Sequence, residues 1–253
     1  MLETELQIPR ETAIDLARAD QSGIIKCFTS WKDWADPESG DWYDWRSLAP
    51  TLGCRLEHYR DRSNSWYLAP EDGSRPIAEA LRAAYYSEPP ARPYATIGSS
   101  MGGYGAMLVG ALSGADFVLA IGPQTILGMQ ALKEVRAIRF VEDFERLDAN
   151  IRTARYRDII PVMRKARRTL FVSICGKNNN IDVDHLNRIK NEPNALCFWL
   201  DGSDHENTAR RCKELKILQY LYGYFLSLDG RRADSRDLAI NILRNYPNLS
   251  LAF

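Results

Sequence analysis

Short runs of apolar residues recur along the chain, and in the segments between them apolar residues are spaced three and four apart. The short runs have the length and the β-branched or aromatic content of buried strands. They cover residues 24–29, 54–59, 94–98, 117–121, 170–175 and 195–200. The wider spacing predicts helices, among them 10–19 and 77–85. This alternation predicts an α/β fold, with a mostly parallel central sheet and helices on both faces.

Residues 125–168 break the alternation, because they carry many charges at helical spacings and no convincing strand. We expect two or three helices here. They would form a helical insertion after the strand at 117–121 that either crosses over the sheet edge or caps the functional site. After the last predicted strand, the pattern indicates a long helix over about 208–226 and a second helix over 235–245.

The length allows one large α/β domain or two small ones, and we expect a single domain over residues 1–253. Hydrophobic content of 45% and charged content of 26% are ordinary for a globular protein. The 33 basic and 33 acidic residues cancel, so nothing favours a nucleic-acid partner. No apolar run approaches the ~20 residues of a membrane span, and the acidic N-terminus lacks the apolar segment of a secretory signal. We therefore expect a cytoplasmic protein.

The five cysteines lie far apart and form no Cys-x-x-Cys pair, and four of them stand in apolar runs. Such residues behave as small buried hydrophobes. We expect reduced, buried thiols in place of disulfides or a zinc site, and no metal or organic cofactor. The five are Cys27, Cys54, Cys175, Cys197 and Cys212.

The segment 94–106 carries the strongest chemical signal. An apolar, β-prone run leads into a Gly-x-Ser-x-Gly-Gly turn, and the small and apolar residues that follow suit a packed helix. In this context the motif is the nucleophile elbow of a serine hydrolase, with Ser100 at its tip. A sharp turn of this kind leaves no room for a Cβ atom at Gly98 or Gly102. The alternative is a glycine-rich helix start that holds a phosphate, but the Lys or Gly-x-Gly-x-x-Gly spacing of such loops is absent.

The order of polar residues after later strands supports a catalytic triad. An elbow of this type predicts an acid after a later strand and a histidine after the last one. Asp182 and Asp184 compete for the acid, and the loser would cap the helix ahead of His185. Of the three histidines, His58 lies in a strand before the nucleophile and His185 directly follows the acids. His205 is therefore the predicted base.

Two further parts of the site follow from the same motif. The oxyanion of an acyl-transfer intermediate needs preorganised N–H donors. One is the backbone N–H of Met101, and the loop after strand 24–29 offers either Ser30 or Trp31. Aromatic residues in polar loops either line a substrate pocket or pack on the sheet. The candidates for substrate binding are Trp66, Tyr67 and Tyr104.

The elbow segment resembles that of the α/β-hydrolase superfamily. More narrowly, the chain is similar to small bacterial serine hydrolases linked to polysaccharide or glycoprotein modification, including the hydrolase-like accessory protein of the secretion system for glycosylated adhesins. The matching segments are 61–67 with its Trp-Tyr end, Gly122-Pro123-Gln124, Tyr156-Arg157-Asp158, and an Asp-x-x-His pattern at Asp182 and His185. The last match favours Asp182 over Asp184 as the acid. The resemblance implies hydrolysis or transfer of an O-acetyl ester on a carbohydrate.

We therefore expect a serine hydrolase that cleaves or transfers an acyl group from a carboxylic ester, with a small molecule or a carbohydrate ester as substrate. One alternative is a thioesterase or peptidase with the same triad. Another is a hydrolase-fold accessory module with little catalysis. Residues 230–253 end in an apolar stretch after a helix, which indicates either a docking segment for a protein partner or the junction to a further domain.

Overall fold

The computed structural model of the protein describes residues 23–32, 44–45, 54–68, 79, 92–136, 140–228 and 233–252. The helix expected over 10–19 lies outside the described residues, as does the helix expected over 77–85 except for Glu79.

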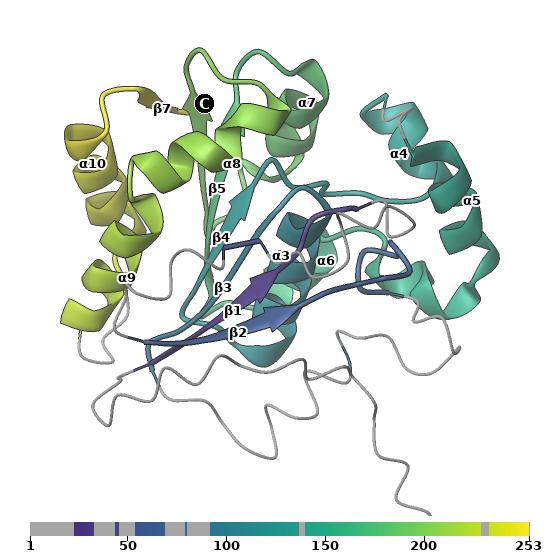
Figure 1. Ribbon diagram of the computed structural model, residues 1–253, viewed down its shortest axis with the longest axis horizontal. Helices are drawn as coiled ribbons and strands as arrows, with labels where there is room; N and C mark the ends of the chain where they lie inside the picture. Colours follow the sequence, from purple (N-terminus) through teal and green to yellow (C-terminus); the bar gives the residue numbers. More distant parts are fainter. Residues whose placement is uncertain are drawn as a thin grey trace, which may run out of the picture.

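A seven-stranded sheet forms the centre of the molecule (Figure 1). Its strands are β1 (Ile24–Phe28), β2 (Arg55–Tyr59), β3 (Tyr94–Ser99), β4 (Phe117–Ile121), β5 (Leu170–Gly176), β6 (Ala195–Leu200) and β7 (Leu249–Leu251). The strand order is β2-β1-β3-β4-β5-β6-β7, and every pair is parallel except β6 with β7. The chain moves from β1 to β2 in one direction and then returns to β3 on the other side. Parallel sheets bind ligands where the strand order reverses in this way, at the carboxyl ends of the strands.

Helices cover both faces of this sheet, as the alternating pattern predicted. They are α3 (Met101–Ser113), α4 (Met129–Glu134), α5 (Val141–Ala149), the 3₁₀ helix η4 (Ile151–Tyr156), α6 (Ile160–Lys165), α7 (Asn180–Ile189), α8 (His205–Glu214), α9 (Ile217–Ser227) and α10 (Ser235–Asn245). Apolar side chains of α3, α5, α6 and α7 share one core cluster, and those of α8, α9 and α10 share another. Alternate residues of the central strands β4 and β5 enter the two clusters, because successive side chains of a strand point to opposite faces. Val118 and Leu119 of β4 are such a pair.

The insertion between β4 and β5 consists of α4, α5, η4 and α6, which confirms the expectation of a helical segment there. It adds a single antiparallel bridge, between Ile126 and Asp158. Its apolar residues, including Phe144 and Met163, belong to the core cluster of α3. Figure 1 shows α4 and α5 on the side of the molecule away from α9 and α10.

Three local predictions were wrong. The expected helix over 208–226 is two helices, α8 and α9, because Lys216 between them has a left-handed backbone (φ 55°). The chain also adds a strand after the expected last one, since β7 follows α10 and pairs with β6. In α7, Asn179 is the N-cap and accepts hydrogen bonds from the N–H groups of residues 181 and 182, so Asp184 lies inside the helix and does not cap it.

All five cysteines are free and buried. Burial raises the pKa of their thiols, to about 11 for Cys54 and to about 12 for Cys197 and Cys212. Among the described residues, no helix combines the length and the apolar character that a membrane crossing requires.

Candidate active site

Ser100 stands at the turn between β3 and α3, in a backbone conformation with φ 53° and ψ −124°. Positive φ is costly for a residue with a side chain. The surrounding backbone holds it there, since the Ser100 N–H donates to the carbonyl of Ile121 at 2.9 Å. A Cβ on Gly98 would lie 2.0 Å from the carbonyl oxygen of Gly102, and a Cβ on Gly102 would lie 2.3 Å from that of Phe28. Both positions therefore require glycine, as the sequence motif predicted.

His205 contacts Ser100 across the carboxyl ends of the strands. Its Nε2 lies 3.0 Å from Ser100 Oγ, within hydrogen-bond distance. The ring is carried by the first residue of α8, and Asp204 caps this helix by accepting from the N–H of Asn207 at 2.9 Å. The helix start thus holds the imidazole at the end of β6, next to the elbow.

Asp182 lies behind His205, with both carboxylate oxygens 2.8 Å from Nδ1. It is buried, in the first turn of α7. When Nδ1–H donates to a carboxylate, Nε2 of the neutral ring is left as an acceptor. Asp184 is two residues further along the helix, about 200° around its axis. The structure therefore brings Asp182 to the histidine, and Asp184 faces elsewhere.

The residues expected to donate to an oxyanion differ in whether their N–H groups already have an acceptor. Met101 is the first residue of α3, where backbone N–H groups have no acceptor within the helix. The N–H of Ser30 donates to Asp44 Oδ2 at 2.8 Å, and the Ser30 hydroxyl donates to the same oxygen at 2.6 Å. Ser30 is thus already committed to a carboxylate, which leaves Trp31 as the remaining candidate of the two.

Trp66, Tyr67 and Tyr104 are fully buried and belong to the core cluster of α3. The Tyr67 hydroxyl donates to the carbonyl of Thr29 at 2.8 Å, and its ring packs against α3 at Gly105. All three side chains are therefore closed off from solvent, and none forms the open wall of a pocket.

Gln124 is a neighbour of Ser100 to which the sequence reasoning gave no role. Its Nε2 donates to Ser100 Oγ at 3.3 Å, and its Oε1 accepts from Trp66 Nε1 at 3.1 Å. In the sequence, Gln124 stands just after the strand that ends at Ile121, next to the elbow strand, and it closes the Gly122-Pro123-Gln124 segment that carries part of the resemblance.

A second histidine, His185, is buried close to the site. Its Nδ1 accepts from the N–H of Thr125 at 3.0 Å. Burial, together with the nearby charges of Arg188 and His205, lowers the pKa of His185 to about 3. The ring is therefore neutral at ordinary pH. In the described part of the chain, no cluster of His, Cys, Asp and Glu side chains is arranged to hold a metal ion.

Comparisons with known proteins identify the fold. No family model matches the sequence, and no curated protein does. The capsule O-acetyltransferase of Neisseria meningitidis serogroup A is similar in structure, with a TM-score of 0.58 and 16% identity over 79% of this chain and 87% of that one. A carboxylesterase of Nitrososphaera gargenis is also similar, with a TM-score of 0.51 and 13% identity over 84% of this chain and 93% of that one. The chain has the α/β-hydrolase fold.

A third similar structure is the Glycosylation Associate Protein (Gap123) complex from Streptococcus agalactiae. The TM-score is 0.55 at 16% identity, and the match covers 85% of this chain but 44% of that one. A variant of the Neisseria enzyme has been solved in complex with CoA. In this α/β-hydrolase fold, Ser100, Asp182 and His205 follow β3, β5 and β6 in the chain order that the elbow predicts.

Proposed function

We propose that the protein is a serine hydrolase or acyltransferase that takes an acyl group from a carboxylic ester, with Ser100 as nucleophile, His205 as base and Asp182 as acid. One observation carries this proposal: Ser100 Oγ lies 3.0 Å from His205 Nε2, while His205 Nδ1 lies 2.8 Å from Asp182. Such an arrangement activates a serine hydroxyl, which is otherwise a poor nucleophile.

The reaction proceeds in two steps. His205 Nε2 takes the Ser100 hydroxyl proton as Oγ attacks the acyl carbon, and Asp182 stabilises the imidazolium. The tetrahedral intermediate collapses, the ester C–O bond breaks, and Nε2 gives the proton to the leaving oxygen. Water or an acceptor hydroxyl then gives a proton to Nε2 and attacks the acyl-enzyme. The second collapse releases the acid or the new ester, and Ser100 Oγ regains its proton.

The negative oxygen of each intermediate needs donors. We assign the backbone N–H groups of Met101 and Trp31 to this task, since Ser30 donates to Asp44. Losing one such donor typically lowers the rate by about 10²–10³-fold.

For the substrate, we propose an O-acetyl ester of a carbohydrate. The support is the likeness to a capsule O-acetyltransferase and to a glycosylation-associated complex, together with the matching sequence segments. Acetyl-CoA is the acyl donor to test for the transfer reaction, because the Neisseria enzyme has been solved with CoA.

The decisive experiment is labelling with a fluorophosphonate probe, which reacts with an activated serine. We expect the wild type to be labelled and Ser100→Ala not to be. Ser99→Ala, a change at the neighbouring serine, is the matched control and should label normally. A wild type that stays unlabelled would exclude the triad chemistry and favour the accessory-module alternative.

Substrate class is then resolved by turnover. We expect acetate release from p-nitrophenyl acetate and from O-acetylated polysaccharide, with transfer from acetyl-CoA measured in the presence of unacetylated polysaccharide. Preferential cleavage of longer acyl-CoA thioesters without an acceptor would instead identify a thioesterase, and cleavage of aminoacyl amides a peptidase.

A further inference from the structure

Ser100 Oγ has two polar neighbours in the described structure, His205 and Gln124. A serine hydroxyl donates one hydrogen bond and can accept two. With its proton directed to His205, one lone pair accepts from Gln124 Nε2 and the other is left for attack on the acyl carbon. Gln124 is buried, with 5% of the residue's surface exposed.

The orientation of the Gln124 amide is determined by Trp66. An indole N–H can only donate, so the amide atom that faces Trp66 Nε1 at 3.1 Å must be the oxygen. The amide nitrogen therefore faces Ser100. Rotating the amide by 180° would set two donors against each other in a buried place, which is costly.

Trp66 is itself held in a strained loop. Trp66 and Tyr67 both have left-handed backbones, with φ values of 55° and 63°. Non-glycine residues in this region persist only where the surroundings impose it, and they cluster at functional sites. Here the buried carboxylate of Asp61 imposes it, because it accepts from the N–H groups of Ser63, Ser65 and Tyr67 at 2.7–3.1 Å and from both serine hydroxyls.

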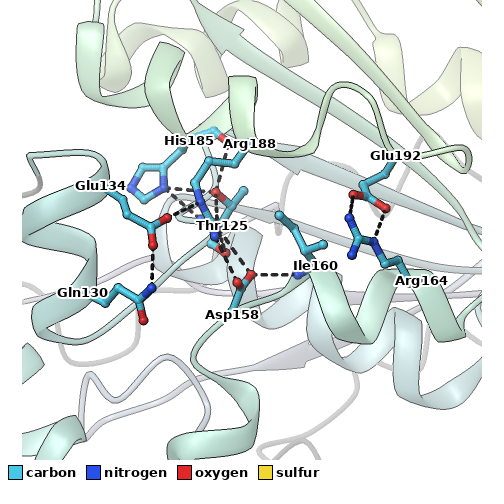
Figure 2. A network of polar contacts seen from close by, with 9 residues as sticks. All are labelled: Thr125, Gln130, Glu134, Asp158, Ile160, Arg164, His185, Arg188 and Glu192. Atoms are coloured by element: carbon cyan, nitrogen blue, oxygen red, sulfur yellow. Dashed lines mark hydrogen bonds and ion pairs between the residues drawn. The ribbon is translucent and has the colours of Figure 1, made fainter.

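The backbone of Thr125, the residue after Gln124, is held by a network of polar contacts, as Figure 2 shows. The N–H of Thr125 donates to His185 Nδ1 at 3.0 Å, and Thr125 Oγ1 donates to the His185 carbonyl at 3.0 Å. The Thr125 carbonyl accepts from Arg188 Nη1 at 2.8 Å, while Nη2 of the same guanidinium donates to Asp158 at 3.0 Å. Gln124 is thus held through its side chain by Trp66 and through its backbone by this network.

We propose that Gln124 is a catalytic residue that donates a hydrogen bond to Ser100 Oγ during acyl transfer. This inference rests on the proposed function. In the resting state the bond aims the hydroxyl proton at His205. It stabilises the negative charge that Oγ acquires as it loses its proton, and again when the acyl-enzyme collapses and Oγ leaves the acyl carbon. Trp66 is a positioning residue that acts through Gln124.

The test compares fluorophosphonate labelling rate and kcat/KM for p-nitrophenyl acetate among variants. We expect Gln124→Ala to lower both by about 10- to 100-fold, the range for a hydrogen bond to a charged group. Gln124→Glu keeps the acceptor for Trp66 but has no N–H, so it should lose at least as much. Gln124→Asn keeps the amide but is one methylene shorter, so it should also lose the hydrogen bond to Ser100. It replaces Gln124→Glu in the test if the introduced carboxylate prevents folding. Gln130→Ala, the same change on exposed α4, is the control and should stay within about twofold.

Trp66→Phe distinguishes positioning from general packing. Alone, it should lower the labelling rate by about two- to tenfold, less than the loss of the charge-assisted bond itself. In the Gln124→Ala background it should have no further effect, because the residue through which it acts is gone. A purely structural Trp66 would give additive losses and overturn the positioning claim.

The outcomes separate the two claims. If the wild type is labelled and Gln124→Ala and Gln124→Asn are labelled at the same rate, the role of Gln124 is overturned while the triad stands. If the wild type is not labelled, the proposed function fails, and the Gln124 role fails with it.

Discussion

Two sets of residues meet at Ser100 Oγ and differ in chemistry. The histidine branch consists of His205 and Asp182, each on the first turn of its own helix after a strand. The amide branch consists of Gln124, Trp66 and the loop held by Asp61. The first branch can move a proton, whereas the second can only direct and stabilise charge. The comparison shows that Ser100 Oγ is contacted by two separate groups of residues, and that the one reaching it through Gln124 places no titratable group against it.

The largest loss of activity is expected when the proton acceptor is removed. His205→Ala should lower kcat/KM for p-nitrophenyl acetate by at least about 10⁴-fold, since a triad without its base loses most of its catalysis. His58→Ala, on β2, is the matched control and should retain activity. Equal activity of the two variants would remove His205 from the mechanism.

The next largest effect distinguishes the two acids. Asp182→Asn should lower kcat by about 10²–10⁴-fold, because the amide can hold the wrong imidazole tautomer and cannot stabilise the imidazolium. Asp184→Asn should change kcat by less than about threefold, as expected for a substitution that touches no part of the site. Steady-state kinetics on the pair checks this, and the reverse ranking would exchange their roles.

The next prediction concerns the amide branch and the free energy of unfolding. Asp61→Asn places an NH₂ group among five donated hydrogen bonds, and we expect a loss of about 2–4 kcal/mol in the free energy of unfolding. Asp143→Asn, at an exposed ion pair with Arg146, should cost less than about 1 kcal/mol. Urea unfolding measures both. A neutral Asp61→Asn would mean that the loop does not depend on this carboxylate.

The smallest predicted effect concerns pH. The pKa of His185 is about 3 in the folded chain and about 6.5 when unfolded. The unfolded chain binds the His185 proton more tightly than the folded chain does. The contribution of neutral His185 to the free energy of unfolding is therefore complete above pH 6.5 and is lost as pH falls towards 3. Between pH 7.5 and 5 the loss should reach about 2 kcal/mol. His185→Asn keeps an acceptor for Thr125 and should remove this part of the pH dependence, measured by urea unfolding at each pH.

The histidine branch could be predicted from the sequence and the amide branch could not. Histidine is rare in this chain, and the elbow dictates an order of nucleophile, acid and base along it. Likewise, six strands follow from local apolar runs. The segment Gly122-Pro123-Gln124 by itself gives Gln124 no role, and nothing local links it to Trp66, because that contact joins residues 58 positions apart and exists only after packing. The break at Lys216 and the short β7 were missed for the same reason, since packing and pairing decide them and local propensity is weak there.

The reactivity of the buried cysteines can be used to measure local unfolding of the native chain. Thiol reagents attack the thiolate, and burial raises the pKa of all five thiols well above physiological pH. The five lie on or beside β1, β2, β5, β6 and α8, so they sample the sheet from one edge almost to the other. A reagent that reacts with an exposed thiol faster than the chain recloses would therefore be consumed only as fast as the structure opens. The order in which the thiols react would show which strands separate first.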